Sequence, residues 1–356
     1  MNHRKFLTLF FAVFFIVALV AMVGCAEPEE EVVPEEPEEA VEEEPEEEEV
    51  AEEPEEDISI DIIVGFGAGG SNDLTARYLA DYLSEHGIIA SVVNMPGGMS
   101  TEAAYHVAGQ DPESNMFFWG HTGPLLFEPA AGDRGYTIDD FEPVAVLAAP
   151  TFCIGARPGA PWGDDFDAMV EYIQENPGEV TFGGQGEGNV RHYAVEQILP
   201  PDELDYTFVG LEGGADVAMN LQGEHVDVGH LSLAAASPLV ADGELWAVVN
   251  TNPLVERVDL MPEVPNVSEY GIPEGQEPHP IGLWAIQGTD PALIERLTNA
   301  IKEIADDPGL QESYKEMGVV AHYLGPDDAW EFYMNVQENV VPDYMEWLEA
   351  YTAGGN

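Results

Sequence analysis

The stretch GFGAGG at residues 65–70 has the spacing of a turn that binds a nucleotide. It follows the apolar run 58–64 and precedes the amphipathic run 71–87, which together predict a strand, a glycine-rich turn and a helix. A nicotinamide site also needs an acidic residue about 20 residues further on, where it holds the ribose hydroxyls. Asn94, Met95 and Pro96 occupy that stretch. The sequence therefore disfavours a dinucleotide at this turn.

A glycine-rich turn of this kind presents backbone N–H groups at the start of a helix, which favours carboxylate or phosphate without a side-chain cation. Three more turns of similar composition follow at residues 120–124, 183–189 and 210–216. The four turns divide between two halves of the chain. We interpret them as the walls of an anion-binding cleft, which is the architecture of a solute receptor.

The sequence lacks the common patterns of catalytic and metal-binding residues. It contains no GxSxG nucleophile elbow, no HExxH and no CxxC. Cys153 and His192 would form a thiol hydrolase only with a positioned Asn or Asp, and Cys153 lies in an apolar run that is typical of a buried structural cysteine. We therefore expect no catalytic residue, no metal ion and no cofactor.

Strands and helices alternate along the folded part, which predicts an α/β fold with parallel sheets. In the first half, residues 71–72 supply the expected N-cap of the helix after the glycines, with Asp73 in its first turn. Nearer the C-terminus, Asp290 and Pro291 mark the start of another helix. The last long helix is expected to break at Pro342.

Residues 1–25 have the layout of an export signal. Arg4 and Lys5 precede an apolar stretch over residues 6–23, and Gly24-Cys25 follows, which resembles the lipobox of bacterial lipoproteins. In such proteins the signal is cleaved before the cysteine, whose thiol carries a diacylglycerol. The alternative is an uncleaved membrane anchor, because about 18 apolar residues nearly span a bilayer. Both interpretations place the folded part outside the cytoplasm.

Residues 26–57 are almost entirely Glu, Pro, Val and Ala, and we interpret them as a disordered tether. The tether holds 20 of the 69 acidic residues, so 49 acidic residues and 8 Lys or Arg remain in residues 58–356, a net charge of −41. Such a domain repels itself in dilute buffer and excludes nucleic acid as a partner. Molar salt shortens the screening length to roughly 3 Å, so we expect a halophilic protein.

Nine stretches of the folded part occur in the order found in one known family. They lie at residues 62–83, 92–98, 136–148, 176–192, 208–228, 244–251, 260–273, 281–297 and 317–326. Together they resemble the extracytoplasmic receptors of tripartite tricarboxylate transporters, the Bug or TctC-like proteins. The resemblance covers nearly all of residues 58–350, and the shared order makes it specific.

The resemblance implies an α/β fold of the type II periplasmic-binding-protein class, with two lobes joined by crossing strands and a ligand cleft between them. Lobe I would comprise residues 58–147 and 250–356, and lobe II residues 148–249, with the crossings at 144–156 and 244–251. Family members are not enzymes. They bind small organic acids in the periplasm or at the outer cell surface and deliver them to a large TctA-like and a small TctB-like membrane subunit. We expect a monomer.

On this fold the four turns supply the expected ligand-binding residues, which act mainly through backbone amides and ordered water. These residues are Phe66, Gly67, Ala68, Gly69, Gly70, Ser71, Asp73, His121, Thr122, Gly123, Gly184, Gln185, Gly186, Asn189, His192, Gly210, Gly213, Gly214 and His230. For His192, the sequence leaves open whether its side chain contacts the ligand or bonds locally within its loop.

The chain also departs from the family pattern. Gly65 stands where relatives usually carry Pro. Glu187 and Glu212 would repel a polyanion if they faced the cleft, while Arg191 either meets the ligand or pairs with Glu187. The ligand class therefore stays open between mono-, di- and tricarboxylates and zwitterions. A lipid-anchored sensor with the same fold is the alternative function, and a degenerate enzyme or an adhesive surface protein is a third.

Overall fold

The computed structural model of the protein describes residues 57–252, 257–272 and 279–354. By its internal contacts the chain divides into two units, residues 1–53 and residues 54–356, and the described residues all belong to the second unit. The export signal, the lipobox cysteine Cys25 and the tether up to residue 56 lie outside the described residues.

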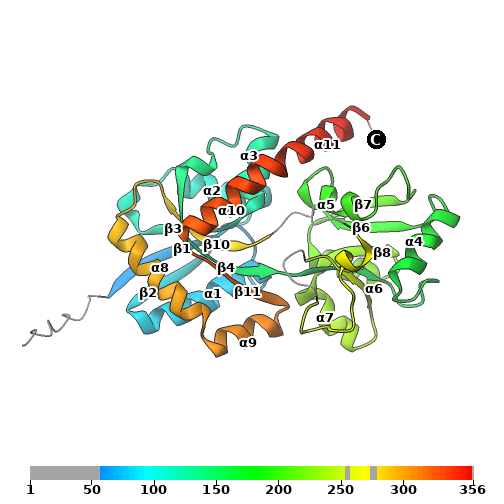
Figure 1. Cartoon of the computed structure of the whole chain (residues 1–356), viewed down its shortest axis with the longest axis horizontal. Coiled ribbons are helices and arrows are strands. Elements are labelled where there is room, and N and C mark those ends of the chain that lie inside the picture. Colours follow the sequence, from blue (N-terminus) through cyan, green and yellow to red (C-terminus); the bar gives the residue numbers. More distant parts are fainter. Residues whose placement is uncertain (1–56, 253–256, 273–278, 355–356) are drawn as a thin grey trace, which may run out of the picture. The chain divides into compact units, whose positions relative to one another are not determined.

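The first of two β-sheets has six strands in the order β11-β4-β10-β3-β1-β2 (Figure 1). β1 pairs in parallel with both β2 and β3, because a helix after each early strand returns the chain to the same end of the sheet. β10 runs antiparallel to β3 and β4. The strands are β1 Ile58–Val64, β2 Ile88–Asn94, β3 Met116–His121, β4 Phe141–Pro150, β10 Ile281–Ile286 and β11 Val319–Leu324.

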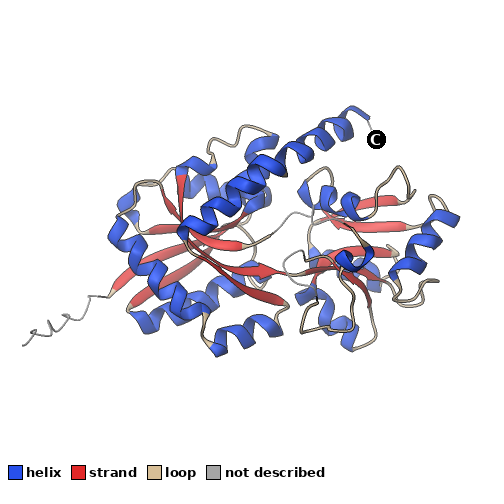
Figure 2. Cartoon of the chain, in the orientation of Figure 1, coloured by secondary structure: helices blue, strands red, loops and turns tan. Residues whose placement is uncertain are grey.

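Helices cover both faces of this sheet (Figure 2). One face packs against helices that bury Leu79 and Leu297, and the opposite face packs against helices that bury Tyr333 and Tyr344. Ile62 and Ile63 of β1 point to opposite faces, as the period of two in a strand requires. The helices are α1 Ser71–Leu83, α2 Thr101–Ala108, α3 Glu128–Ala131, α8 Pro291–Ala305, α9 Pro308–Glu316, α10 Pro326–Asn339 and α11 Val341–Gly354.

The second sheet has five strands in the order β7-β6-β8-β5-β9. β6 pairs in parallel with β7 and β8, and β5 runs antiparallel to β8 and β9. The strands are β5 Phe152–Ala156, β6 Thr181–Gln185, β7 Thr207–Leu211, β8 Val228–Ser232 and β9 Trp246–Asn250. Their helices are α4 Phe166–Glu175, α5 Val190–Ile198, α6 Gly214–Gln222 and α7 Leu233–Ala241.

The chain crosses between the sheets at Thr151, which separates β4 of the first sheet from β5 of the second. It leaves the second sheet after Asn250 and re-enters the first at Ile281, so the return is a long segment rather than one continuous strand. The predicted α/β fold with two lobes is confirmed. For the lobe boundaries we propose Thr151 and Asn250, because residues 148–150 pair within the first sheet.

The predicted helix ends are confirmed near the C-terminus and differ at α1. Asp290 accepts a hydrogen bond from the Ala292 amide and Pro291 opens α8, while α10 and α11 meet at Val340, just before Pro342. At α1 the N-cap is Gly70 rather than a residue of the 71–72 pair. The side chain that binds the turn is instead Asp73, inside the helix, which accepts the Gly69 amide.

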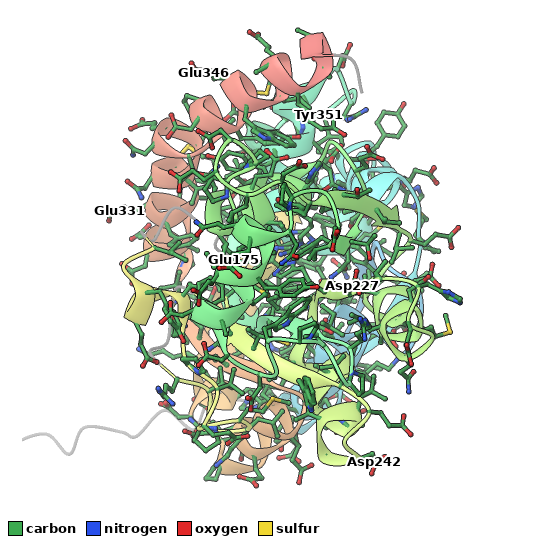
Figure 3. All side chains as sticks on the ribbon, turned by 90° about the vertical axis from the view of Figure 1, so that its right-hand side faces the viewer. Glu175, Asp227, Asp242, Glu331, Glu346 and Tyr351 are labelled. Carbon is green, nitrogen blue, oxygen red and sulfur yellow. The ribbon has the colours of Figure 1, made fainter. Side chains whose placement is uncertain are left out.

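Acidic side chains project from the surface of the described residues (Figure 3). Glu175 on α4, Asp242 after α7, Glu331 on α10 and Glu346 on α11 are all exposed. Because these positions are spread over both sheets' helices, the negative charge is a property of the whole folded surface and not of one patch.

Candidate functional site

The first glycine turn follows β1, and its shape depends on a residue from the turn after β2. A Cβ atom at Gly65 would lie 1.7 Å from the hydroxyl oxygen of Ser100, so no side chain fits at this position. Ser100 is buried and has a positive φ of 77°. Ser100 therefore occupies the space that a side chain at position 65 would need, which explains why this chain has Gly65 instead of the family's Pro. Beyond Gly65 the chain is exposed from Gly67 to Gly70.

Asp73 organises this turn. Its Oδ2 atom accepts the Gly69 amide at 2.8 Å, and its Oδ1 atom accepts Asn94 Nδ2 at 2.8 Å and the Arg77 guanidinium at 2.8 Å. Asn94 also donates to the Phe66 carbonyl at 3.0 Å. Burial acts to raise the pKa of Asp73, but the hydrogen bonds from Arg77, Gly69 and Asn94 outweigh it and lower the pKa. Asp73 is thus an ionised capping residue that holds the first turn.

The second predicted turn lies beside the first because β1 and β3 are neighbours in the sheet. His121, Thr122 and Gly123 are buried, and the Gly123 amide donates to His121 Nδ1 at 3.0 Å. The imidazole of His121 stacks on Phe66, with 5.7 Å between ring centres. The structure therefore brings two of the predicted turns together through an aromatic stack.

The third and fourth turns follow β6 and β7, which are neighbours in the second sheet. Asn189 is the N-cap of α5 and accepts the amides of Arg191 and His192. The Gly186 amide donates to the Leu211 carbonyl at 2.8 Å. A Cβ atom at Gly210 would lie 2.9 Å from Glu187 Cβ, so the two turns are in close contact. Buried Gly184 lies one residue before the end of β6.

The start of α6 forms a small polar site with the end of β6. Gly213 is the N-cap of this helix and has no side-chain cap. A Cβ atom at Gly214 would lie 3.7 Å from Gln185 Nε2 and 3.7 Å from the Ser232 amide. Gln185 Nε2 is buried without a hydrogen-bond partner among the described residues. This unsatisfied donor and the helix N-terminus both favour a negatively charged acceptor.

A cluster of aromatic and basic side chains connects the two sheets, and we call it the central cluster. Its rings lie in series: His121 is 3.6 Å from His279, His279 is 5.8 Å from Phe152, and Phe152 stacks on His230 at 5.3 Å, all between ring centres. Arg191 Cζ lies 4.1 Å from the centre of the Phe152 ring. The cluster comprises Phe66, His121, Phe152, Arg191, His230 and His279.

The central cluster carries charge in a buried setting. Arg191 and His279 are each 7% exposed, and His121 and His230 less. Burial, the charge of Arg191 and the proximity of His230 lower the pKa of His279 well below its ordinary value. His279 is consequently neutral at neutral pH, while the guanidinium of Arg191 stays charged.

His192 lies in a different place, which we call the α11 contact. Its ring stacks on Phe208 at 3.7 Å and its Nε2 atom lies 3.1 Å from Glu196 Oε1. Trp347 of α11 donates to the other Glu196 oxygen, and Tyr351 donates to Glu187 Oε1 at 2.7 Å. The α11 contact comprises Glu187, His192, Glu196, Phe208, Trp347 and Tyr351.

Of the predicted site residues, the structure brings Phe66, His121 and His230 together in the central cluster and directs His192 to α11. Sequence reasoning missed Phe152 and His279. Phe152 is adjacent to the apolar Cys153, and His279 stands in a proline-rich loop without periodicity, so neither carried a signal of its own. His230 also contacts Thr251, with 3.1 Å between Nε2 and Oγ1.

Cys153 is fully buried on β5, as the sequence predicts, and burial raises its pKa to about 12. Its thiol is therefore protonated and unsuited to nucleophilic attack. Among the described residues, no group of three or more His, Cys, Asp or Glu side chains could hold a metal ion. Within residues 57–252, 257–272 and 279–354, no helix has the length and apolar character to cross a membrane.

Comparison with known proteins identifies the family. The profile described as "Tripartite tricarboxylate transporter family receptor" (TctC) matches residues 92–340. A protein of the UPF0065 group from Bordetella pertussis is 28% identical over 264 residues, which cover 73% of this chain and 80% of that protein.

Two solved structures share the fold. The structure titled "R. palustris Rpa4515 with adipate" has a TM-score of 0.70 at 23% identity and covers 83% of this chain and 97% of its own. The structure of MatC (Rpa3494) from Rhodopseudomonas palustris with bound malate has a TM-score of 0.65 at 23% identity, with 82% and 98% covered. The chain therefore belongs to the TctC family and is an extracytoplasmic solute-binding receptor of the tripartite tricarboxylate transport type, not an enzyme.

Proposed function

We propose that this receptor captures a small organic carboxylate where its two sheets meet and delivers it to a large TctA-like and a small TctB-like membrane subunit. One observation carries the proposal. The central cluster brings aromatic and basic side chains from both sheets into contact, and an anion bound beside it would contact both lobes at once. Relatives of the same fold with adipate and malate support a carboxylate as the ligand class.

Helix termini would add to this attraction. The start of α6, with Gly213, Gly214 and the buried amide of Gln185, lies at the same edge of the second sheet as Ser232. Each helix N-terminus favours a negative charge by about 0.3–1 kcal/mol when exposed. The backbone amides of the remaining predicted turn residues, including Gly67–Ser71 and Thr122–Gly123, would donate hydrogen bonds to the ligand.

A thermal-shift screen of organic acids in molar salt tests this function. A ligand at 100 times its Kd adds about 2.7 kcal/mol to the free energy of unfolding, which raises the melting temperature measurably. The neutral amide of each acid is the matched ligand control. We expect His121→Ala to abolish the shift, while Tyr105→Ala, at an exposed aromatic residue of α2, retains it. No shift with any small carboxylate, in protein shown to be folded by circular dichroism, would refute the function.

We further propose that the mature protein begins at lipidated Cys25 and that residues 26–57 tether a monomeric receptor to the membrane. The sequence layout supports this proposal. Cys25→Ser should abolish labelling by a fatty-acid analogue and release soluble or uncleaved protein. Membrane attachment without any lipid label in the unchanged protein would instead indicate an uncleaved anchor.

A further inference from the structure

One edge of the first sheet carries no charged side chain. β2 is the last strand at this edge and pairs with β1, and within the described residues no strand pairs with its other side (Figure 1). Residues 88–101 contain no Asp, Glu, Lys or Arg, although the chain has 69 acidic residues. Proteins commonly place charges or proline on an exposed edge, which prevents pairing with another chain. This edge lacks that protection.

The same edge exposes apolar side chains. Ile89 is 54% exposed and Val93 is 41% exposed, and the exposed Ser91 lies between them. The three residues share one face of the sheet, because side chains of a strand alternate with a period of two. With Met99 and Tyr105, Ile89 and Val93 make up four of the five large exposed apolar residues in the described part of the chain. Such a grouping on a charged surface indicates an interaction site.

The other edge strands of the two sheets differ from β2. No residue of β9 or β11 is exposed. β7 exposes only Thr207 and Gly210, and the exposed acids Asp205 and Glu212 flank it. Among the described strands, an edge that is both apolar and free of charge is therefore particular to β2.

The backbone groups of β2 alternate in direction. The Met95 amide, just after the strand, donates to the Val64 carbonyl of β1 at 2.8 Å. Because alternate residues of a strand direct their N–H and C=O groups to opposite sides, the odd-numbered residues of β2 bond to β1. The N–H and C=O groups of Ala90 and Val92 consequently point to the open edge. They form a template for one further strand.

We propose that this edge pairs with the same edge of a second copy of the protein, antiparallel and about a two-fold axis at Ser91. In this register Ala90 of one copy and Val92 of the other form hydrogen-bonded pairs. Ile89 then faces Val93 of the other copy in the closer, non-hydrogen-bonded type of pair. Apolar β-branched pairs of this kind stabilise neighbouring strands. The patch is thus its own complement, as a two-fold interface requires.

The pairing keeps the acidic surfaces of the two copies apart. Because residues 88–101 carry no charge, two domains of like charge would meet at an uncharged edge. Asp61 lies beside Ser91 on β1, so it would be three strand spacings, about 14 Å, from Asp61 of the second copy. This distance exceeds the screening length of roughly 3 Å in molar salt. Molar salt should therefore permit the association.

The association is expected to be weak and reversible, between the monomeric receptors proposed above. One strand of 7 residues paired with its copy falls short of the roughly 1,000 Å² that a stable interface buries. Receptors tethered to one membrane would meet at a high effective concentration, which favours such a contact. The paired residues belong neither to the central cluster nor to the α11 contact, so each copy keeps its own ligand site.

A cysteine at the two-fold axis tests the pairing. Ser91→Cys is introduced into the full chain together with Cys25→Ser, and the remaining Cys153 is fully buried. Opposite residues of a non-hydrogen-bonded pair lie about 4.5 Å apart at Cα, within the range of a disulfide. Oxidation with copper phenanthroline in roughly 3 M KCl should give a disulfide-linked dimer. The matched control is Ser59→Cys, exposed one strand inward, and its dimer should form at least about 10-fold more slowly.

Ala90→Pro separates strand pairing from random collision. The Ala90 N–H points to the open edge, so proline there breaks no bond to β1 but removes one hydrogen bond per copy between the two edges. In the Ser91→Cys chain it should slow disulfide formation about 10-fold. Val93→Lys places an ammonium group against Ile89 of the other copy and should also slow the reaction, although it reduces the net negative charge.

Equal rates for Ser91→Cys and Ser59→Cys would overturn the pairing, and so would an unchanged rate in folded Ala90→Pro. If circular dichroism shows that Ala90→Pro is unfolded, Val93→Lys decides, and an unchanged rate in that variant would overturn the pairing. The same oxidation is also done in intact cells. There, an adduct of the Ser91→Cys variant with a different protein, in place of the dimer, would assign the edge to another partner and overturn the pairing with a second copy.

Discussion

The central cluster and the α11 contact both place histidines on aromatic rings, yet they differ in the charge beside the histidine. In the central cluster, His279 packs against Phe152, which also carries Arg191 over its ring. In the α11 contact, His192 packs on Phe208 and its neighbour is the carboxylate of Glu196.

We propose that the two contacts have different roles. Burial acts to raise the pKa of Glu196, but hydrogen bonds from His192 and Trp347 outweigh it and lower the pKa. The α11 contact therefore contains its own acid and its own donors. The central cluster places the buried guanidinium of Arg191 over Phe152 and near His279, whose pKa is lowered well below its ordinary value. We infer that the first place recognises the ligand and that the second holds α11 against α5.

Salt concentration should have the largest effect on the melting temperature. It should act on the charged surface far more than on the central cluster or the α11 contact. Between roughly 0.1 M and roughly 3 M KCl, the screening length falls from about 10 Å to below 3 Å, so repulsion among the acidic side chains fades. The melting temperature should rise by many degrees, while the buried aromatic contacts of the two places change little because they carry no surface charge. A flat melting temperature across this range would contradict a halophilic surface.

Trp347→Ala should have the next largest effect and should break the α11 contact alone. The substitution removes a half-buried ring that packs on Tyr193, His192 and Tyr351, together with the hydrogen bond to Glu196. We expect the free energy of unfolding to fall by about 2–4 kcal/mol in urea titrations. Exposed Glu349→Ala on the same helix is the control. A large loss of affinity for a carboxylate that binds the unchanged protein, in the folded variant, would contradict separate roles for the two contacts.

Gly65→Ala should perturb the central cluster through the first turn. The added methyl group would collide with Ser100, so the free energy of unfolding should fall by about 1–3 kcal/mol and Phe66 should shift against His121. Ser100→Gly in the same chain removes the closest contacts, those with the side chain, and also suits the positive φ at residue 100, so it should restore part of the stability; the Cα atom of residue 100, 2.7 Å from the added methyl group, keeps the rescue incomplete. If this second substitution restored no stability at all, the contact with the side chain of Ser100 would not be the main cause.

Acidification below pH 6.5 should lower the free energy of unfolding through His279 of the central cluster. Because the folded-state pKa of His279 is lowered, the unfolded state binds more protons as the pH falls below 6.5, and the free energy of unfolding decreases there. The slope for one group is at most about 1.4 kcal/mol per pH unit. In His279→Gln this slope should be smaller, while the contribution of His322, whose pKa is also lowered by burial, remains. Equal slopes for both proteins would contradict a neutral buried His279.

The local signals in the sequence predicted much of the fold. Strands, glycine turns and helices follow from the apolar periodicity, and the start of α8 follows from Asp290 and Pro291. These features depend on residues close together in the chain. The prediction that residue 71 or 72 is the N-cap of α1 was wrong. The side chain of Asp73 accepts the Gly69 amide in place of such a cap, and Arg77 and Asn94 of the next strand hold it there.

By itself, the sequence determined the α/β class, the family, the burial of Cys153 and the acidity of the domain, since each is carried by composition or by an ordered set of local patterns. Only the tertiary structure decided which side chains meet. His279 reaches Phe152 and His121 across more than a hundred residues of chain, and His192 turns to α11. The physical reason is that such contacts depend on how two sheets and a C-terminal helix pack, and no local periodicity encodes that packing.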